Sequence, residues 1–197
     1  MLVFCERERS VRDDFLSRAK AALQKETGES FQPLHNIKVP EVSSGFFAWI
    51  SSAQVKQTLI ICGHGTDDTQ LLGGYSAGQV AAELARQKVS SAQISVIKLY
   101  SCCVGDKLPT QTQNNFAQQF VIELNKPGSQ LGGVPVFAPM GLIVIRSQSN
   151  NIGVLQAWDW VVERSNGQTL SLKDGMIEYR FNPDNPSFAQ GYIPPTL

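Results

Sequence analysis

The sequence has few cysteines and no long apolar run, and each shortage excludes a class of protein. No stretch approaches the ~18 consecutive apolar residues of a membrane-spanning helix. Charged residues follow the first apolar residues at once, so we expect no signal peptide. Four cysteines in 197 residues are too few for a disulfide-rich secreted domain. We therefore expect a soluble protein with reduced thiols, in the cytoplasm or exported by another route.

Charge of one sign is also lacking, since 17 basic and 17 acidic residues cancel. This balance gives no general attraction to nucleic acid or membranes. A polyanion would need a local basic cluster, and four basic residues of the C-terminal third are the candidates, although such scattered charges more often form a solvated face: Arg146, Arg164, Lys173 and Arg180. The length favours a single domain over residues 1–197.

Two apolar runs, ending at Cys62 and at Tyr100, are rich in Val, Ile and Leu. Such runs predict strands that are buried on both faces, as in a parallel sheet. Residues 76–87 between them predict a helix, because Ser76 and Gln79 have the spacing of a capping box. A right-handed strand, helix, strand unit brings the carboxyl ends of both strands to one edge of the sheet. The fold class is therefore α/β with a mostly parallel central sheet.

The remaining elements follow from apolar spacing and from turn residues. Residues 41–52 are ambiguous between a short helix and a loop, and the proline-rich tail predicts little regular structure. Further helices are expected at 10–25 and 116–124, and further strands at 2–5, 35–39, 134–138, 142–145, 153–162 and 176–181.

Reactive side chains follow both central strands, His64 after the first and Cys102 after the second. A thiol at a strand end, near helix N-termini and an imidazole, becomes a thiolate nucleophile because its pKa is lowered. His64 could assist the thiol or protonate the leaving amine in peptide cleavage. The backbone N–H groups of Gly65 and Cys102 could form an oxyanion hole. Cys103 remains open as an alternative nucleophile.

Three other interpretations compete with this one. The cysteines could be small core hydrophobes and His64 a turn residue. A metal site of Cys62, His64, Cys102 and Cys103 has poor spacing for zinc, so no metal is expected. The sequence Gly-Tyr-Ser-Ala-Gly around Ser76 matches a serine-hydrolase motif, but no core strand directly precedes it and the helix cap explains the serine.

An apolar block ending in His-Gly, followed by a second apolar block ending in a small residue and Cys, resembles the signature of the caspase-like (clan CD) cysteine peptidases. Within that clan the sequence is most similar to the self-processing cysteine protease domain of bacterial RTX and large clostridial toxins. Four ordered segments carry the resemblance: Gly63-His64-Gly65, Leu72-Gly73-Gly74-Tyr75-Ser76-Ala77, Ser101-Cys102-Cys103 and Phe116-Ala117-Gln118-Gln119-Phe120.

The resemblance implies a three-layer α/β/α sandwich and metal-free peptide hydrolysis by a Cys/His dyad, with Cys102 as nucleophile and Cys103 at the position of the family's serine. It also implies inositol hexakisphosphate as an allosteric activator, held by a basic pocket and a C-terminal β-flap that the strands after residue 134 could supply. Three acidic residues lie in the region from which the toxins orient their histidine: Glu6, Asp13 and Asp14.

The expected function is thus a cysteine endopeptidase that cuts a protein or peptide substrate in trans and needs no cofactor for the chemistry. The expected setting is a stand-alone bacterial effector or toxin-associated protease, in the bacterial cytoplasm or delivered to a host cell. The alternative is a catalytically idle caspase-fold binding or adaptor module.

Overall fold

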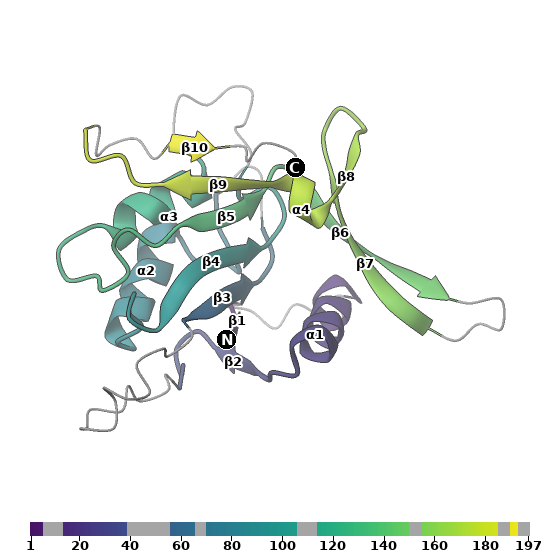
Figure 1. The fold of residues 1–197 in the computed structure, drawn as a ribbon, viewed down its shortest axis with the longest axis horizontal. Coiled ribbons are helices and arrows are strands. Elements are labelled where there is room, and N and C mark those ends of the chain that lie inside the picture. The colour runs from purple at the N-terminus through teal and green to yellow at the C-terminus, as the bar shows by residue number, and fades with distance from the viewer. Residues whose placement is uncertain are drawn as a thin grey trace.

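The computed structural model describes residues 1–5, 14–38, 56–65, 70–105, 114–149, 155–184 and 190–192. Its main sheet consists of β1 (Leu2–Phe4), β2 (Phe31–Pro33), β3 (Gln57–Cys62), β4 (Ile94–Tyr100), β5 (Val136–Pro139), β9 (Met176–Arg180) and β10 (Gln190–Tyr192). The seven strands lie in the order β10-β9-β5-β4-β3-β1-β2 (Figure 1). Strands β1 to β5 pair in parallel, whereas β9 and β10 pair antiparallel at one side. The mostly parallel sheet is as predicted.

A second, smaller sheet contains β6 (Leu142–Ser149), β7 (Leu155–Glu163) and β8 (Thr169–Ser171), in that order and antiparallel. Strands β6 and β7 form a long hairpin that extends away from the main sheet (Figure 1). A short helix, α4 (Leu172–Gly175), connects β8 to β9. These strands lie in the part of the chain after residue 134, from which the resemblance implied a C-terminal β-flap.

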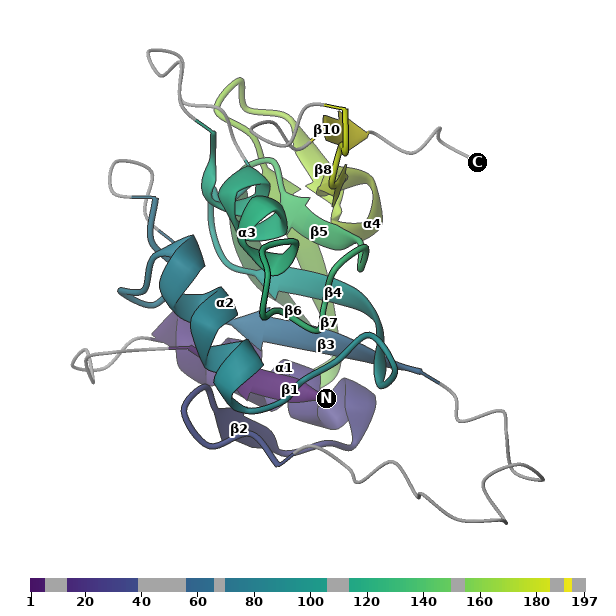
Figure 2. The same cartoon turned by 90° about the vertical axis from the view of Figure 1, so that its left-hand side faces the viewer.

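Helices α2 (Ala77–Arg86) and α3 (Phe116–Leu124) cover one face of the main sheet, where they enclose the larger apolar core. The opposite face carries helix α1 (Asp14–Thr27) and the β6–β7 hairpin, which enclose a second apolar cluster (Figure 2). The predicted three-layer arrangement is therefore confirmed. In the part of the chain that the structure describes, no helix is long and apolar enough to cross a bilayer.

Both helices of the larger core begin with a complete capping box. The Ser76 hydroxyl accepts a hydrogen bond from the Gln79 N–H at 3.3 Å, and the Gln79 side chain accepts one from the Ser76 N–H at 3.0 Å. Asn115 and Gln118 repeat the arrangement at α3. These bonds satisfy N–H groups that a helix start leaves unpaired. The prediction that Ser76 caps a helix is confirmed.

Two secondary-structure predictions were wrong. No strand forms at residues 35–38; the strand is Phe31–Pro33, at the edge of the sheet, where a residue without an N–H is tolerated. Part of the tail, expected to be irregular, forms β10 and pairs with β9. The ambiguous segment 41–52 and the expected helix start at Ser10 lie outside the described residues.

Candidate active site

The register of β3 and β4 determines the geometry of the site. Ile61 lies opposite Leu99, and Cys62 opposite Tyr100. His64 and Cys102 therefore each stand two residues beyond the last pair of two adjacent parallel strands. Neighbouring strands are about 4.8 Å apart, so the two turns that follow them must be close. The expectation that both residues share one edge of the sheet agrees with this register.

The two turns touch through Gly65. A Cβ atom built on Gly65 would collide with the Cys102 carbonyl oxygen, and it would lie 2.7 Å from Ser101 Oγ and 2.8 Å from the Cys102 carbonyl carbon. Ser101 is fully buried. Neither Gly65 nor Ser101 has room for a larger side chain, because the backbone after His64 passes directly against the backbone around Cys102. Gly63 is similarly confined, by the carbonyl oxygen of Cys5.

The two adjacent cysteines have different surroundings. Cys102 is partly exposed, packs at the margin of the second apolar cluster and has its sulfur 3.9 Å from the Ile143 carbonyl oxygen. Cys103 is only 7% exposed and adopts a left-handed backbone conformation (φ 57°). Its N–H donates to the Gly141 carbonyl at 2.9 Å. Of the two thiols, that of Cys102 is therefore the more accessible to a substrate.

Tyr100 is the last residue of β4 and directly precedes the turn that contains Cys102. Its ring meets the Trp160 ring edge-on at 5.2 Å, and the Trp160 indole donates to Glu26 on α1 at 2.7 Å. Burial raises the pKa of Tyr100 to about 12, with smaller contributions from Glu26 and Cys62. The Tyr100 phenol therefore stays neutral. Through Trp160 and Glu26, the β6–β7 hairpin and α1 are both connected to β4, the strand that precedes Cys102.

Hydrogen bonds that local sequence patterns do not predict connect the segments after His64 and after Cys102 to α3 and β9. The Gln70 side chain accepts from the Phe116 N–H at 2.7 Å, which joins the end of the His64 loop to α3. The Asn115 amide donates to the Gly105 carbonyl at 2.9 Å and to the Tyr179 hydroxyl at 3.1 Å. Tyr179 itself donates to the Gly105 carbonyl at 2.6 Å. Of these residues, only Asn115 had a local signal, its capping-box spacing with Gln118.

Replacing Asn115 with alanine should lower the free energy of unfolding by about 2–3 kcal/mol, because it removes a helix cap and two buried hydrogen bonds, to Gly105 and Tyr179. Ser76→Ala is the matched control, since it removes an exposed capping box and should cost only about 1 kcal/mol. Urea denaturation measures both values. Equal losses would mean that the bonds to Gly105 and Tyr179 contribute nothing to stability.

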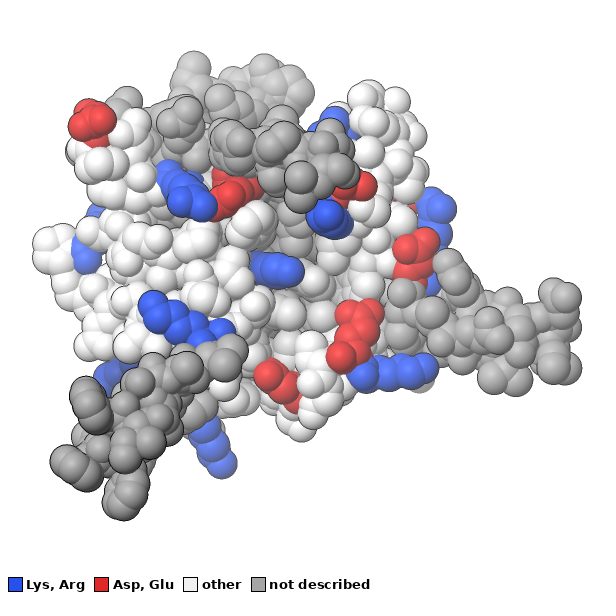
Figure 3. All heavy atoms as spheres, viewed as in Figure 1, with Lys and Arg blue, Asp and Glu red and all other residues white. Residues whose placement is uncertain are grey.

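The four basic candidates lie on different elements. Arg146 pairs with Glu163 at 3.0 Å, and Arg180 pairs with Glu178 at 2.5 Å. Arg164 donates to Gln168 and to the Met140 sulfur, and Lys173 is exposed on α4. On the face shown in Figure 3, Lys and Arg side chains are interspersed with Asp and Glu side chains. Arg146 and Arg180 are thus each paired with a glutamate, while a shared polyanion site for the four residues stays a prediction.

Of the three acidic candidates for orienting His64, one lies in the part of the chain that the structure describes. Glu6 and Asp13 lie outside the described residues, and Asp14 begins α1. Among the described residues, no group of three or more His, Cys, Asp or Glu side chains is arranged to hold a metal ion.

Comparison with known proteins then identifies the family. The model of the Peptidase C80 family matches residues 45–150, which include both turns and both adjacent cysteines. No curated protein matches the sequence. The match covers more than half of the 197 residues and agrees with the caspase-like α/β architecture. The chain belongs to the Peptidase C80 family, a family of clan CD cysteine peptidases.

Proposed function

We propose that this cysteine peptidase is an endopeptidase in which Cys102 is the nucleophile and His64 the general acid and base. The observation that carries the proposal is the common register: both residues lie two positions beyond paired strand ends, and Gly65 packs against the Cys102 carbonyl. The partial exposure of Cys102, against the burial of Cys103, favours the first thiol.

In the proposed reaction the Cys102 thiolate attacks the carbonyl carbon of the scissile peptide bond. The tetrahedral oxyanion is stabilised by the backbone N–H groups of Gly65 and Cys102. When the C–N bond breaks, the His64 imidazolium gives its proton to the departing amine, which leaves a thioester on Cys102. A water molecule, deprotonated by His64, then hydrolyses the thioester and restores the thiol.

The outer edge of β6 is suited to hold the substrate backbone. Strand β6 lies at the edge of the small sheet, where it pairs with β7 as its one neighbouring strand among the described residues. The Ile143 carbonyl faces the Cys102 sulfur, and neighbouring Leu142 is 48% exposed. An extended peptide can add to such an edge as a further strand. Because that edge continues along β6, the acyl side of a substrate can extend well beyond the scissile bond, as an endopeptidase requires.

The rival proposal is an idle binding module of the same fold. A peptidyl acyloxymethyl ketone separates the two, because it alkylates only an activated catalytic thiol. We expect mass spectrometry to find the adduct on Cys102 in the wild-type protein and in Cys103→Ala. Loss of labelling is expected in Cys102→Ala and in His64→Ala. An unlabelled wild-type protein that is folded would favour the idle module.

We further propose that peptide hydrolysis needs no added cofactor. Two of the four basic candidates already pair with glutamates, which lowers the net positive charge that these four residues offer to inositol hexakisphosphate. We expect it to leave the melting temperature unchanged at millimolar concentration. A ligand present at about 100 times its dissociation constant would stabilise the fold by ~2.7 kcal/mol, which a thermal shift detects readily. A clear upward shift would instead support the activator that the resemblance implies.

From the resemblance we propose that the protein is a bacterial effector or toxin-associated protease that acts on another protein. Its substrate would be read by the β6 edge and by the surface beside His64.

A further inference from the structure

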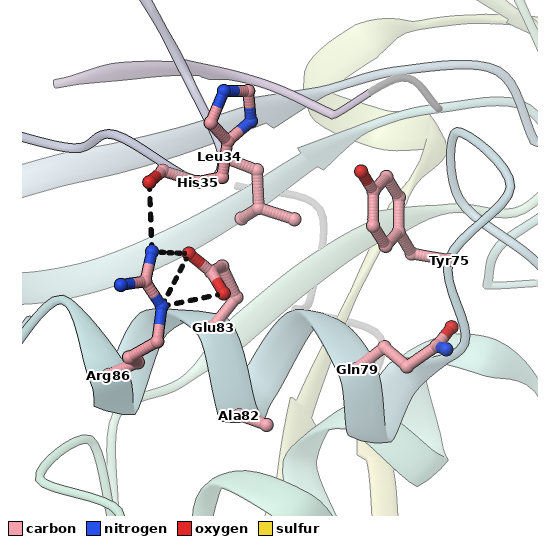
Figure 4. Close-up of a pocket in the computed structure, with 7 residues that line it drawn as sticks. All are labelled: Leu34, His35, Tyr75, Gln79, Ala82, Glu83 and Arg86. Atoms are coloured by element: carbon pink, nitrogen blue, oxygen red, sulfur yellow. Dashed lines mark hydrogen bonds and ion pairs between the residues drawn. The ribbon is translucent and has the colours of Figure 1, made fainter. Parts of the chain in front are cut away.

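A groove of about 320 Å³ runs along the exposed side of α2, between this helix and the turn that follows β2. Figure 4 shows Tyr75 at one end of the groove and Arg86 with Glu83 at the other. Leu34 and Ala82 line its middle. The groove belongs neither to the dyad nor to the β6 edge, and nothing in the catalytic proposal uses it.

The groove is connected to the active site through the backbone. Gly65, which packs against Cys102, forms a β-bridge with Leu72, and Leu72 forms a second bridge with Tyr75. In addition, the Gly73 N–H donates to the His64 carbonyl at 2.6 Å. Each bridge spans about 5 Å, so Tyr75 lies ~10–15 Å from the scissile bond, which an extended peptide covers with three to five residues.

The direction of the substrate follows from the proton that the leaving group needs. If the proposed function holds, the departing amine must lie within hydrogen-bonding reach of His64. The chain on the leaving side of the scissile bond then runs past the His64 turn, and this turn adjoins Tyr75. The acyl side occupies the β6 edge on the other side of Cys102. Among the described residues, Tyr75 is the groove residue joined to this turn by the two bridges, so the leaving chain can reach the groove there.

The chemistry of the groove favours an apolar side chain. Arg86 binds both carboxylate oxygens of Glu83 through Nε at 3.1 Å, and it also donates to the His35 carbonyl at 2.9 Å. This pair cancels its own charge, so the groove offers no net charge to an acidic or basic residue. Most of the remaining lining surface is apolar, with two polar side chains among its members: Leu34, Ala82, Tyr75, His35 and Gln79.

We propose that this groove is a specificity site that binds a large apolar side chain of the substrate, about three to five residues after the scissile bond. The inference rests on the proposed function, since it assumes cleavage at Cys102. It assigns the substrate class as extended polypeptide with an apolar residue on the leaving side, beyond the residues that the dyad itself contacts.

The test uses a peptide library prepared from a digested proteome, incubated with the protein, with cleavage sites identified by mass spectrometry. Ala82→Trp fills the groove with an indole at an exposed helix position, and Ala92→Trp adds the same group at an exposed turn outside it. For wild type and Ala92→Trp we expect leucine, phenylalanine and similar residues to be enriched about tenfold at one of the third to fifth positions after the cut. In Ala82→Trp this enrichment should disappear.

The outcomes separate the two proposals. Cuts that require Cys102 but show no apolar enrichment on the leaving side would overturn the groove inference and leave the catalytic proposal intact. Identical cleavage patterns in Ala82→Trp and Ala92→Trp would overturn the groove inference in the same way. If no cut in the library depends on Cys102, the proposed function fails, and the groove inference fails with it.

Discussion

Cys102→Ala should lower kcat/KM for peptide hydrolysis by on the order of 10⁴-fold or more, because no other group at the site replaces a covalent nucleophile. Cys103→Ala should retain most of the activity, since its buried side chain faces away from solvent and its N–H bond to Gly141 belongs to the backbone. Hydrolysis of a fluorogenic peptide under pseudo-first-order conditions measures both values.

The control for Cys102→Ala and Cys103→Ala is a measurement that each variant is folded. Both variants exchange a small thiol for a methyl group, so circular dichroism and melting temperature should change little. If Cys103→Ala loses as much activity as Cys102→Ala while remaining folded, the nucleophile is assigned to the wrong thiol. If neither variant loses activity, the thiol chemistry lies elsewhere in the chain.

Gly65→Ala should reduce both stability and activity. Its new methyl group would collide with the Cys102 carbonyl oxygen and crowd Ser101 Oγ at 2.7 Å. Overpacking of this kind typically costs about 1–3 kcal/mol of folding free energy. The turn must move away from Cys102 to relieve the collision, and a shift near 1 Å can cost on the order of 10²-fold in rate. Urea denaturation and peptide kinetics on the same sample measure the two effects.

Gly78→Ala provides the matched control within the same βαβ unit. A Cβ at Gly78 meets nothing closer than Glu123 Cδ at 3.6 Å, and the position lies in the first turn of α2. The exchange should therefore stabilise the protein by roughly 0.5 kcal/mol, because alanine is the better helix former. Wild-type kinetics in Gly65→Ala would show that the contact with Cys102 does not determine the geometry of the dyad.

Local sequence patterns were sufficient to predict the central βαβ unit. Two Val/Ile/Leu runs and a Ser76–Gln79 cap are each contained within a few residues, and parallel pairing then leaves only one arrangement of the strand ends. The position of His64 and Cys102 at a common edge followed from that arrangement. Which of the adjacent thiols is exposed did not, because it depends on the turn itself, where the Cys103 N–H is bonded to Gly141, far along the chain.

The features that were missed depend on long-range pairing. Strand β10 forms by pairing with β9, and its three residues, Gln190, Gly191 and Tyr192, give no alternating apolar signal in the sequence. The bonds from Asn115 to Gly105 and Tyr179 join segments up to 64 residues apart in sequence. The strand expected at residues 35–39 was misplaced because β2 is short, lies at the sheet edge and ends in Pro33, which resembles a breaker.

The central position of β3 and β4 has a consequence for how activity is lost. These strands are paired on both sides and lie between two apolar cores, so their amide hydrogens should exchange with solvent only when the whole fold opens. Strand β6 is paired on one side, at the edge of the small sheet, so we expect its amide hydrogens to exchange at lower free energy, although Ile143 and Ile145 pack in the second core. If β6 holds the substrate as proposed, mild heating would release this edge first, and activity would be lost while the turns around Gly65 and Cys102 are still in contact.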